Sequence, residues 1–244
     1  SEMLPELIYL EERSEDFPLL IVLGFVSVLA GYGAASLLFP SEVDLLSVIF
    51  ASIPLVYPLT RYFLEDEQNG SPHIPEIQVY GSIFIGEVLG FISLGILFPG
   101  AFSLQTSIVG ASGFAVFGSS FTGIIINNLT VFGAILALAA FIGSAGAFVL
   151  TWNASVLGIF FANLLEAIDS TTGFFTCQPT PSPLCYAPHT VFEMTGFIVA
   201  GVAGSLISAA IYREHFDTET WEDYLKLVSL GLIMIFLGAF LETA

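Results

Sequence analysis

The sequence is short of charge, and the charge it has is almost all of one sign. Only 11% of its 244 residues are charged, with 22 acidic against 4 basic residues, which gives a formal net charge of -18. Soluble domains carry about 25% charged residues, whereas this chain has a mean hydropathy of +0.89. These values exclude an ordinary soluble globule, and also a disordered chain, which needs low hydrophobicity. The negative charge excludes nucleic acid as a partner.

What the sequence has instead is a series of apolar runs of about 20 residues, the length that a helix needs to cross about 30 Å of hydrocarbon. They predict an all-α fold, a polytopic transmembrane helix bundle of about seven spans. The spans expected are Leu19–Phe39, Leu45–Phe63, Val79–Phe98, Gly123–Ala147, Asn153–Ile168, Thr190–Tyr212 and Leu225–Leu241.

Two parts of this map need separate argument. The apolar stretch 123–168 is long enough for two helices, and we place the break at Thr151-Trp152-Asn153, where polar residues beside an interfacial Trp suit a turn. The segment 99–122 is rich in Gly, Ser and Phe and carries no charge. It is therefore expected to be a re-entrant or interfacial segment.

The four basic residues predict the sidedness of the chain. Arg13 precedes the first span, Arg61 ends the second, Arg213 ends the sixth and Lys226 begins the seventh. With seven spans and a cytoplasmic N-terminus, all four lie inside, as the positive-inside rule requires. The chain is thus expected to be a multi-pass protein of the cell membrane with its C-terminus outside.

Most of the acidic residues fall on the same predicted cytoplasmic face. Anionic lipid headgroups repel such a face at ordinary salt, but at 1 M salt the Debye length falls to about 3 Å. The acidity therefore favours halophilic, and in particular haloarchaeal, adaptation. Acidic surface loops of a mesophile or a cation-attracting vestibule remain the alternative.

Cys177 and Cys185 lie in a proline-rich loop that this topology places outside. An oxidising exterior allows a disulfide to persist, so a structural disulfide is predicted. Zinc binding is the weaker alternative, because neither a second CxxC nor a close His pair completes four ligands.

Ionisable residues inside spans are costly, at roughly 2.5–3.5 kcal/mol each, and are candidate functional groups. Glu87 falls in the middle of the third span. His189 and Glu193 are four residues apart at the start of the sixth, on one helical face, with Pro188 placed to begin that helix. Further hydrogen-bond partners are available from Asn127, Asn128 and Asn153.

Three interpretations of these residues stay open. Polar packing between helices is the simplest, since Asn and His bonds of about 1 kcal/mol commonly join spans. A transporter or channel would use Glu87 and Glu193 to bind a cation or proton. A metal-dependent intramembrane enzyme would use Glu87, His189 and Glu193 as ligands. Neither H-E-x-x-H nor G-x-S-x-G occurs, so no catalytic residue, metal or cofactor is assigned.

Small residues are dense in three of the predicted spans and allow helices to approach closely, either within the bundle or in a dimer. The small-xxx-small pairs are Gly143 with Ala147 and Ala200 with Gly204, and the third span carries Gly81, Gly86, Gly90 and Gly95.

The polar residues follow a particular order: Asn127-Asn128, a Gly/Ala-rich span, Asn153, and then Pro188-His189-x-x-x-Glu193 leading into another Gly/Ala-rich helix. This order resembles that of the stage II sporulation protein M family of integral membrane proteins. The resemblance covers about residues 75–244. Ala154 and Thr190 stand where the family pattern has Gly.

The resemblance implies a membrane scaffold that organises partner proteins rather than an enzyme. A sporulation role does not transfer to a chain from a halophile, whereas the architecture does. The expected partners are membrane lipids, other membrane proteins and a second copy of the chain. The expected organisation is an acidic cytoplasmic segment (1–18), an N-terminal helix pair (19–64), an acidic loop (65–78) and a sporulation-protein-M-like membrane domain (79–244).

Overall fold

The computed structural model describes residues 16–66, 73–112, 120–167, 183–214 and 218–243, and this part of the chain is helical without strands. Its long helices are α2 (Phe17–Leu38), α3 (Val43–Asp66), α4 (Ile74–Leu97), α6 (Phe121–Ile142), α7 (Gly146–Ala167), α8 (Pro183–Arg213) and α9 (Thr218–Thr243). A short helix, α5 (Ser103–Ser112), and two 3-10 turns, η2 (Pro40–Glu42) and η4 (Gly143–Ala145), lie between them.

Each long helix has 22 to 31 residues, so each rises about 33 Å or more and can cross a membrane. Six apolar stretches of the described chain are long enough to span, and the longest, Phe121–Glu166, contains both α6 and α7. The predicted all-helical bundle of about seven spans is confirmed.

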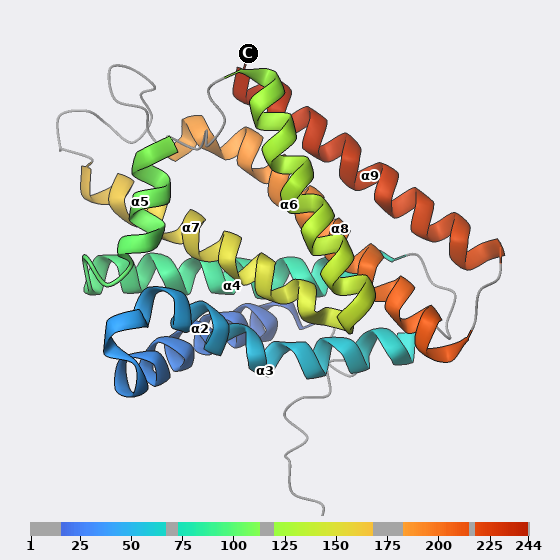
Figure 1. Ribbon diagram of the computed structural model, residues 1–244, viewed down its shortest axis with the longest axis horizontal. Coiled ribbons are helices and arrows are strands. Elements are labelled where there is room, and N and C mark those ends of the chain that lie inside the picture. The colour runs from blue at the N-terminus through green and yellow to red at the C-terminus, as the bar shows by residue number, and fades with distance from the viewer. Residues whose placement is uncertain (1–15, 67–72, 113–119, 168–182, 215–217, 244) are drawn as a thin grey trace, which may run out of the picture.

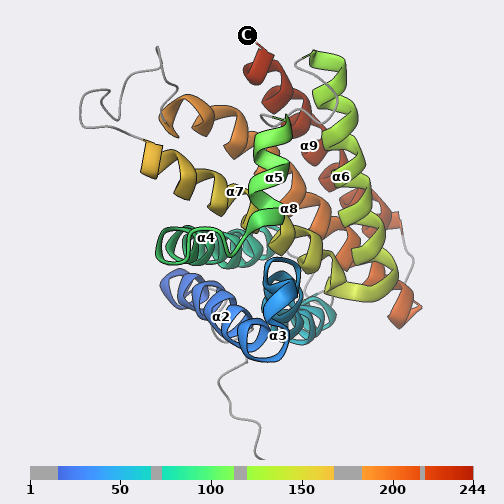
Figure 2. The same ribbon diagram turned by 60° about the vertical axis from the view of Figure 1, so that its left-hand side comes forward.

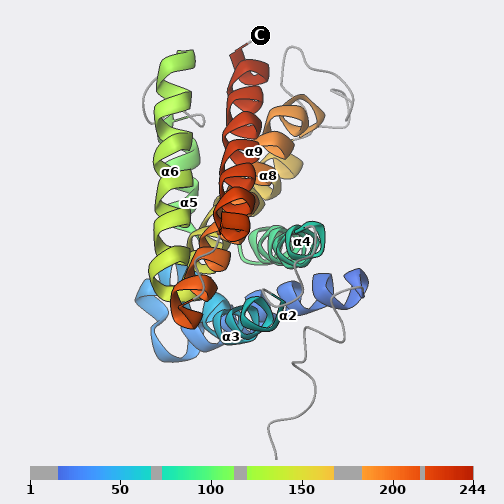
Figure 3. The same ribbon diagram turned by 90° about the vertical axis from the view of Figure 1, so that its right-hand side faces the viewer.

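The helices form two groups that cross each other. Helices α2, α3 and α4 pack together on one side, while α6, α8 and α9 pack together on the other (Figures 1 and 3). Helix α7 contacts both α4 and α8 and so joins the groups.

The helices converge at one end of the molecule, which we call the Arg213 end. There the Arg213 guanidinium donates to the Leu64 carbonyl at the end of α3. The Ser144 amide in the α6–α7 turn donates to the Thr60 hydroxyl at 3.2 Å. His73, just before α4, lies 3.7 Å from the Asp223 carboxylate of α9. The sequence predicts that the segments joining α3 to α4, α6 to α7 and α8 to α9 all lie on the cytoplasmic side.

The predicted break between the fourth and fifth spans is in the wrong place. The chain turns at η4, where Gly143 has a φ of +63°, a value that suits glycine. Thr151, Trp152 and Asn153 instead lie inside α7. Gly143 and Ala147 therefore do not form a small-xxx-small pair on one helix.

Glycines allow the backbones of neighbouring helices to touch inside the bundle. A Cβ placed on Gly24 of α2 would lie 2.1 Å from the Ile83 carbonyl oxygen, and one on Gly86 of α4 would lie 2.0 Å from that of Ile21. Gly204 of α8 meets α6 in the same way, 2.6 Å from the Leu136 carbonyl oxygen. Close packing of this kind is a main source of helix association in membranes.

Within the predicted re-entrant or interfacial segment 99–122, the described chain contains α5, which packs on α7 and α3 (Figure 2). Its ten residues rise only about 15 Å, too little to cross a bilayer. Asp44 of α3 anchors its first turn by accepting bonds from the Ser103 hydroxyl and the Leu104 amide, both at 3.1 Å.

The predicted disulfide lies outside the described residues, which include neither Cys177 nor the side chain of Cys185.

Candidate functional site

Glu193 forms a buried hydrogen bond between two helices. The Asn128 side-chain amide on α6 donates to the Glu193 carboxyl oxygen on α8 at 2.6 Å, and both residues are buried. Asn127 in turn donates to the Asn128 side-chain oxygen at 3.3 Å. Asn127, Asn128 and Glu193, which all belong to the family motif, are thus linked by successive hydrogen bonds between α6 and α8.

Helix α9 closes the other side of Glu193. A Cβ on Gly238 would lie 2.5 Å from the Glu193 Cγ and 3.2 Å from the His189 carbonyl oxygen, so glycine leaves room for both residues. The His189 side chain is buried one turn before Glu193.

Glu87 lies in a second buried polar pair, between α4 and α7. The Thr151 hydroxyl is 2.7 Å from the Glu87 carboxyl oxygen and 2.9 Å from the Ala147 carbonyl oxygen of its own helix. A cavity of about 10 Å³ adjoins the pair, lined by apolar residues together with Tyr80. This volume is at the lower limit for holding one water molecule.

The two carboxyls do not share a site. A Cβ on Gly201 of α8 would lie 3.3 Å from Leu150 and 3.7 Å from Tyr80, which both line the cavity at Glu87. Glu193 is eight residues earlier on α8, a rise of about 12 Å. Within the described residues no group of three or more His, Cys, Asp or Glu residues is placed to hold a metal ion. Glu87, His189 and Glu193 are therefore not brought together as one ligand set.

Two motif residues occupy positions that differ from those expected. Asn153 donates to the Val149 carbonyl oxygen of its own helix at 2.7 Å, rather than to the Glu193 cluster. Pro188 was expected to begin its helix, but α8 starts at Pro183 and Pro188 lies inside it.

A third buried carboxyl was missed because the sequence placed it in a cytoplasmic loop. Glu76 lies in the first turn of α4 and is fully buried, with the His73 ring nitrogen 3.0 Å from one carboxyl oxygen. The signal that could have revealed it is the i, i+3 spacing of His73 and Glu76 at a helix start, where a carboxylate is favoured.

Gln105 and Thr151 were also missed, since neither is ionisable. Gln105 of α5 is fully buried and donates to the Asp44 carbonyl oxygen at 2.9 Å and to Ser155 of α7 at 3.3 Å. These bonds connect α5 with both α3 and α7.

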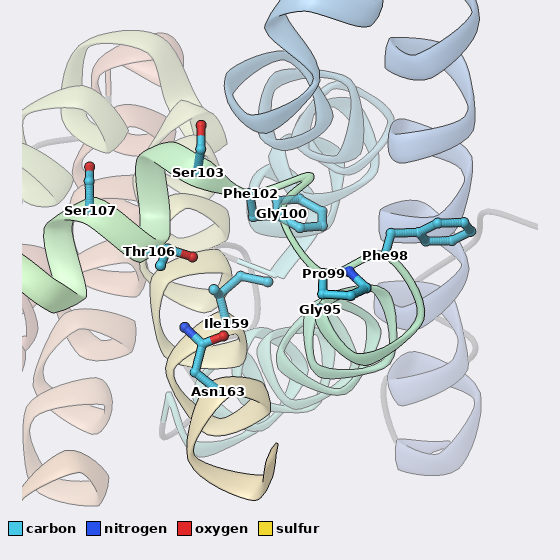
Figure 4. Close-up of a pocket in the computed structure, with 10 residues that line it drawn as sticks. All are labelled: Gly95, Phe98, Pro99, Gly100, Phe102, Ser103, Thr106, Ser107, Ile159 and Asn163. Atoms are coloured by element: carbon cyan, nitrogen blue, oxygen red, sulfur yellow. The ribbon is translucent and has the colours of Figure 1, made fainter. Parts of the chain in front are cut away.

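A cavity of about 360 Å³ lies beside α5, between the turn after α4 and helix α7. Figure 4 shows Asn163 and Thr106 on either side of Ile159, whereas the Ser103 and Ser107 hydroxyls point away from Ile159. The lining is mostly apolar, and no buried charged group is part of it.

These features define an all-helical, multi-pass membrane protein in which two buried carboxyls, Glu87 and Glu193, join neighbouring helices. The sequence profile of the stage II sporulation protein M family matches residues 83–244, more than half of the chain, and the chain belongs to that family. No curated protein and no solved structure matches it. The match begins within α4, so α2 and α3 precede it.

Proposed function

We propose that this protein is a non-enzymatic membrane scaffold that binds a transmembrane helix of another membrane protein through α6. The observation that carries the proposal is the exposed face of small residues on this helix. Gly133, Ala134 and Ala137 are all exposed, with Ile126 and Phe141 at the two ends of the face.

Gly133 shows why this face suits a partner helix. Glycine weakens a helix interior by roughly 0.5–1 kcal/mol relative to alanine, and Gly204 and Gly231 offset this cost by packing against α6. At Gly133 nothing lies within 4 Å of the position that a Cβ would take. A partner helix could approach the backbone here as closely as α8 approaches α6. A similar opening at Gly33 on α2 lies before the matched region.

The buried carboxyls support a structural role rather than chemistry. Glu193 joins α8 to α6 through Asn128, and Glu87 joins α4 to α7 through Thr151. Bonds of this kind fix helices relative to one another. The Asn128–Glu193 bond holds α6 on α8 with the small-residue face of α6 turned outward.

The family resemblance supports a scaffold role, whereas we do not propose a role in sporulation. We further propose that the protein lies in the cell membrane of a halophile, with its N-terminus and the Arg213 end in the cytoplasm. Its acidic surface and its four basic residues support these points.

Site-specific photo-crosslinking in native membranes tests the partner. A photoreactive residue at position 137 is expected to give a discrete adduct with another membrane protein, and Ala134→Leu is expected to remove that adduct. The control position is Leu89, which is exposed on α4. Equal adducts at both positions, or none at 137, would refute the proposal, and an adduct of twice the chain's mass would identify the partner as a second copy.

Ion flux in proteoliposomes tests the transporter alternative. We expect no cation or proton flux above that of empty liposomes, and the same result for Glu87→Gln and Glu193→Gln. A flux that either substitution abolishes would favour transport over scaffolding.

A further inference from the structure

A second cavity of about 360 Å³ lies at the Arg213 end, between α3, the α6–α7 turn and α8. It differs from the cavity beside α5 because five of its eleven lining residues carry hydroxyl groups. We call it the hydroxyl pocket, and these residues are Thr60, Ser144, Ser205, Ser208 and Tyr212.

The hydroxyls of the pocket differ in how accessible they are. Ser144 is 0% exposed, and Ser205 is also buried and bonds to the Tyr80 hydroxyl at 3.2 Å. Thr60 and Ser208 are only partly buried. A molecule that enters the pocket therefore meets the Thr60 and Ser208 hydroxyls.

The rim of the pocket is apolar and faces outward. Phe141 is 85% exposed, Ile142 61% and Tyr212 79%. In a membrane these side chains face lipid, and Tyr is typical of the level of the headgroups. The rim therefore fits an acyl chain, while the hydroxyls behind it fit the polar part of the same molecule.

One of the chain's few basic groups lies beside the pocket. Arg213 follows Tyr212 and donates to the carbonyl of Leu64, which also lines the pocket. Guanidinium groups recognise phosphate through paired N–H donors.

We propose that the hydroxyl pocket binds the headgroup of an anionic phospholipid. Arg213 attracts the phosphate, Ser208 donates to its oxygens or to the glycerol ester, and an acyl chain lies along Phe141 and Ile142. The binding joins α3, η4 and α8, which meet at this end, and it is independent of the partner face on α6.

Native mass spectrometry of the whole protein in mild detergent tests this site. The probes are phosphatidylglycerol and phosphatidylcholine with the same two acyl chains. We expect phosphatidylglycerol to be retained about tenfold more strongly, which corresponds to about 1.4 kcal/mol. Arg213→Gln keeps a donor for Leu64 and is expected to remove the preference. Ser208→Leu fills the pocket and is expected to abolish retention of both lipids.

The matched control is Ser93→Leu, a partly exposed serine on α4 outside the pocket, which is expected to bind like the unmodified protein. If Ser208→Leu fails to fold, Tyr212→Ala at the exposed rim replaces it. Equal retention of the two lipids by the unmodified protein would overturn the proposal, and so would retention that the pocket variants leave unchanged. Displacement of the lipid by excess inorganic phosphate would also overturn it, by assigning the pocket to a soluble anion.

Discussion

At the scale of single residues, Glu87 and Glu193 within the spans have specific partners on neighbouring helices. The sequence identified Glu87, Asn128 and Glu193 as unusual, because charged and amide groups are costly in hydrocarbon. It could not identify the partners, since Asn128 and Glu193 are 65 residues apart in the chain and Glu87 and Thr151 are 64 apart. Only the packing of the helices selects Asn128 rather than Asn153 as the donor to Glu193.

The Asn128–Glu193 bond can be measured with a double-mutant cycle. Asn128→Ala removes the donor to a buried carboxyl. Its coupling to Glu193→Ala is expected to lie between about 0.6 kcal/mol, the average for bonds between membrane helices, and about 1.7 kcal/mol, the largest value found. The measurement is the free energy of unfolding in mixed micelles of a mild detergent and dodecyl sulfate. Asn153 bonds within its own helix, so Asn153→Ala is expected to show no coupling to Glu193→Ala. Coupling of the control, or none for Asn128, would contradict the assignment.

Thr151→Val tests the second polar pair with almost no change of shape. The substitution removes the hydroxyl that bonds to Glu87, so unfolding is expected to become easier by about 1–3 kcal/mol. The matched control is Thr195→Val on α8, because Thr195 is more exposed and its hydroxyl bonds to the Val191 carbonyl. Equal effects of the two substitutions on the unfolding free energy would show that the Glu87 bond contributes nothing of its own.

At the scale of helices, the sequence predicted the number of spans correctly but misplaced one break. The polar residues at 151–153 looked like a turn, yet Thr151 and Asn153 each bond to a carbonyl of the preceding helical turn and remain inside α7. The turn instead depends on the backbone freedom of Gly143. Glycine is common throughout these spans, so its presence alone could not separate a turn from close packing between helices.

Substitutions of two glycines on α4 separate the effect of close helix packing on stability from the effect of glycine on the helix itself. Gly86→Ala places a Cβ 2.0 Å from the Ile21 carbonyl oxygen of α2, so α2 has to move and stability is expected to fall by about 1–3 kcal/mol. Gly81→Ala on the same helix meets nothing within 4 Å and is expected to stabilise by about 0.5–1 kcal/mol. Unfolding midpoints in detergent provide the comparison. A stable Gly86→Ala protein would mean that α2 and α4 do not touch at this point.

At the scale of the whole molecule, the scarcity of charge and the sign of that charge have different causes. The apolar spans account for the scarcity of charge. The net charge of -18 therefore lies mainly on the surfaces outside the membrane. Little positive charge offsets it, since only 4 basic residues stand against 22 acidic ones, and Lys226 pairs with Asp223 at 2.8 Å.

Salt dependence follows from this imbalance. Raising the ionic strength from 0.1 M to 1 M shortens the Debye length from about 10 Å to about 3 Å and so weakens repulsion between carboxylates. We expect the melting temperature in an uncharged detergent to rise with sodium chloride over this range. Sucrose at matched osmolality is the control for solvent effects that do not involve charge. A melting temperature that is independent of salt would contradict halophilic adaptation.

The four basic residues predict which side of the membrane each end of the bundle faces, and the packing supports this prediction. The packing brings Arg61 and Arg213 to the same end, while Ser41 lies in the connection between α2 and α3. Because α3 spans the bilayer, Ser41 and Arg61 must face opposite sides. In a chain carrying Cys177→Ser and Cys185→Ser, an impermeant maleimide applied to intact cells should label Ser41→Cys. Thr218→Cys, at the start of α9, should react only after the membrane is opened. The reverse pattern would place the Arg213 end outside and show that so few positive charges do not orient this protein.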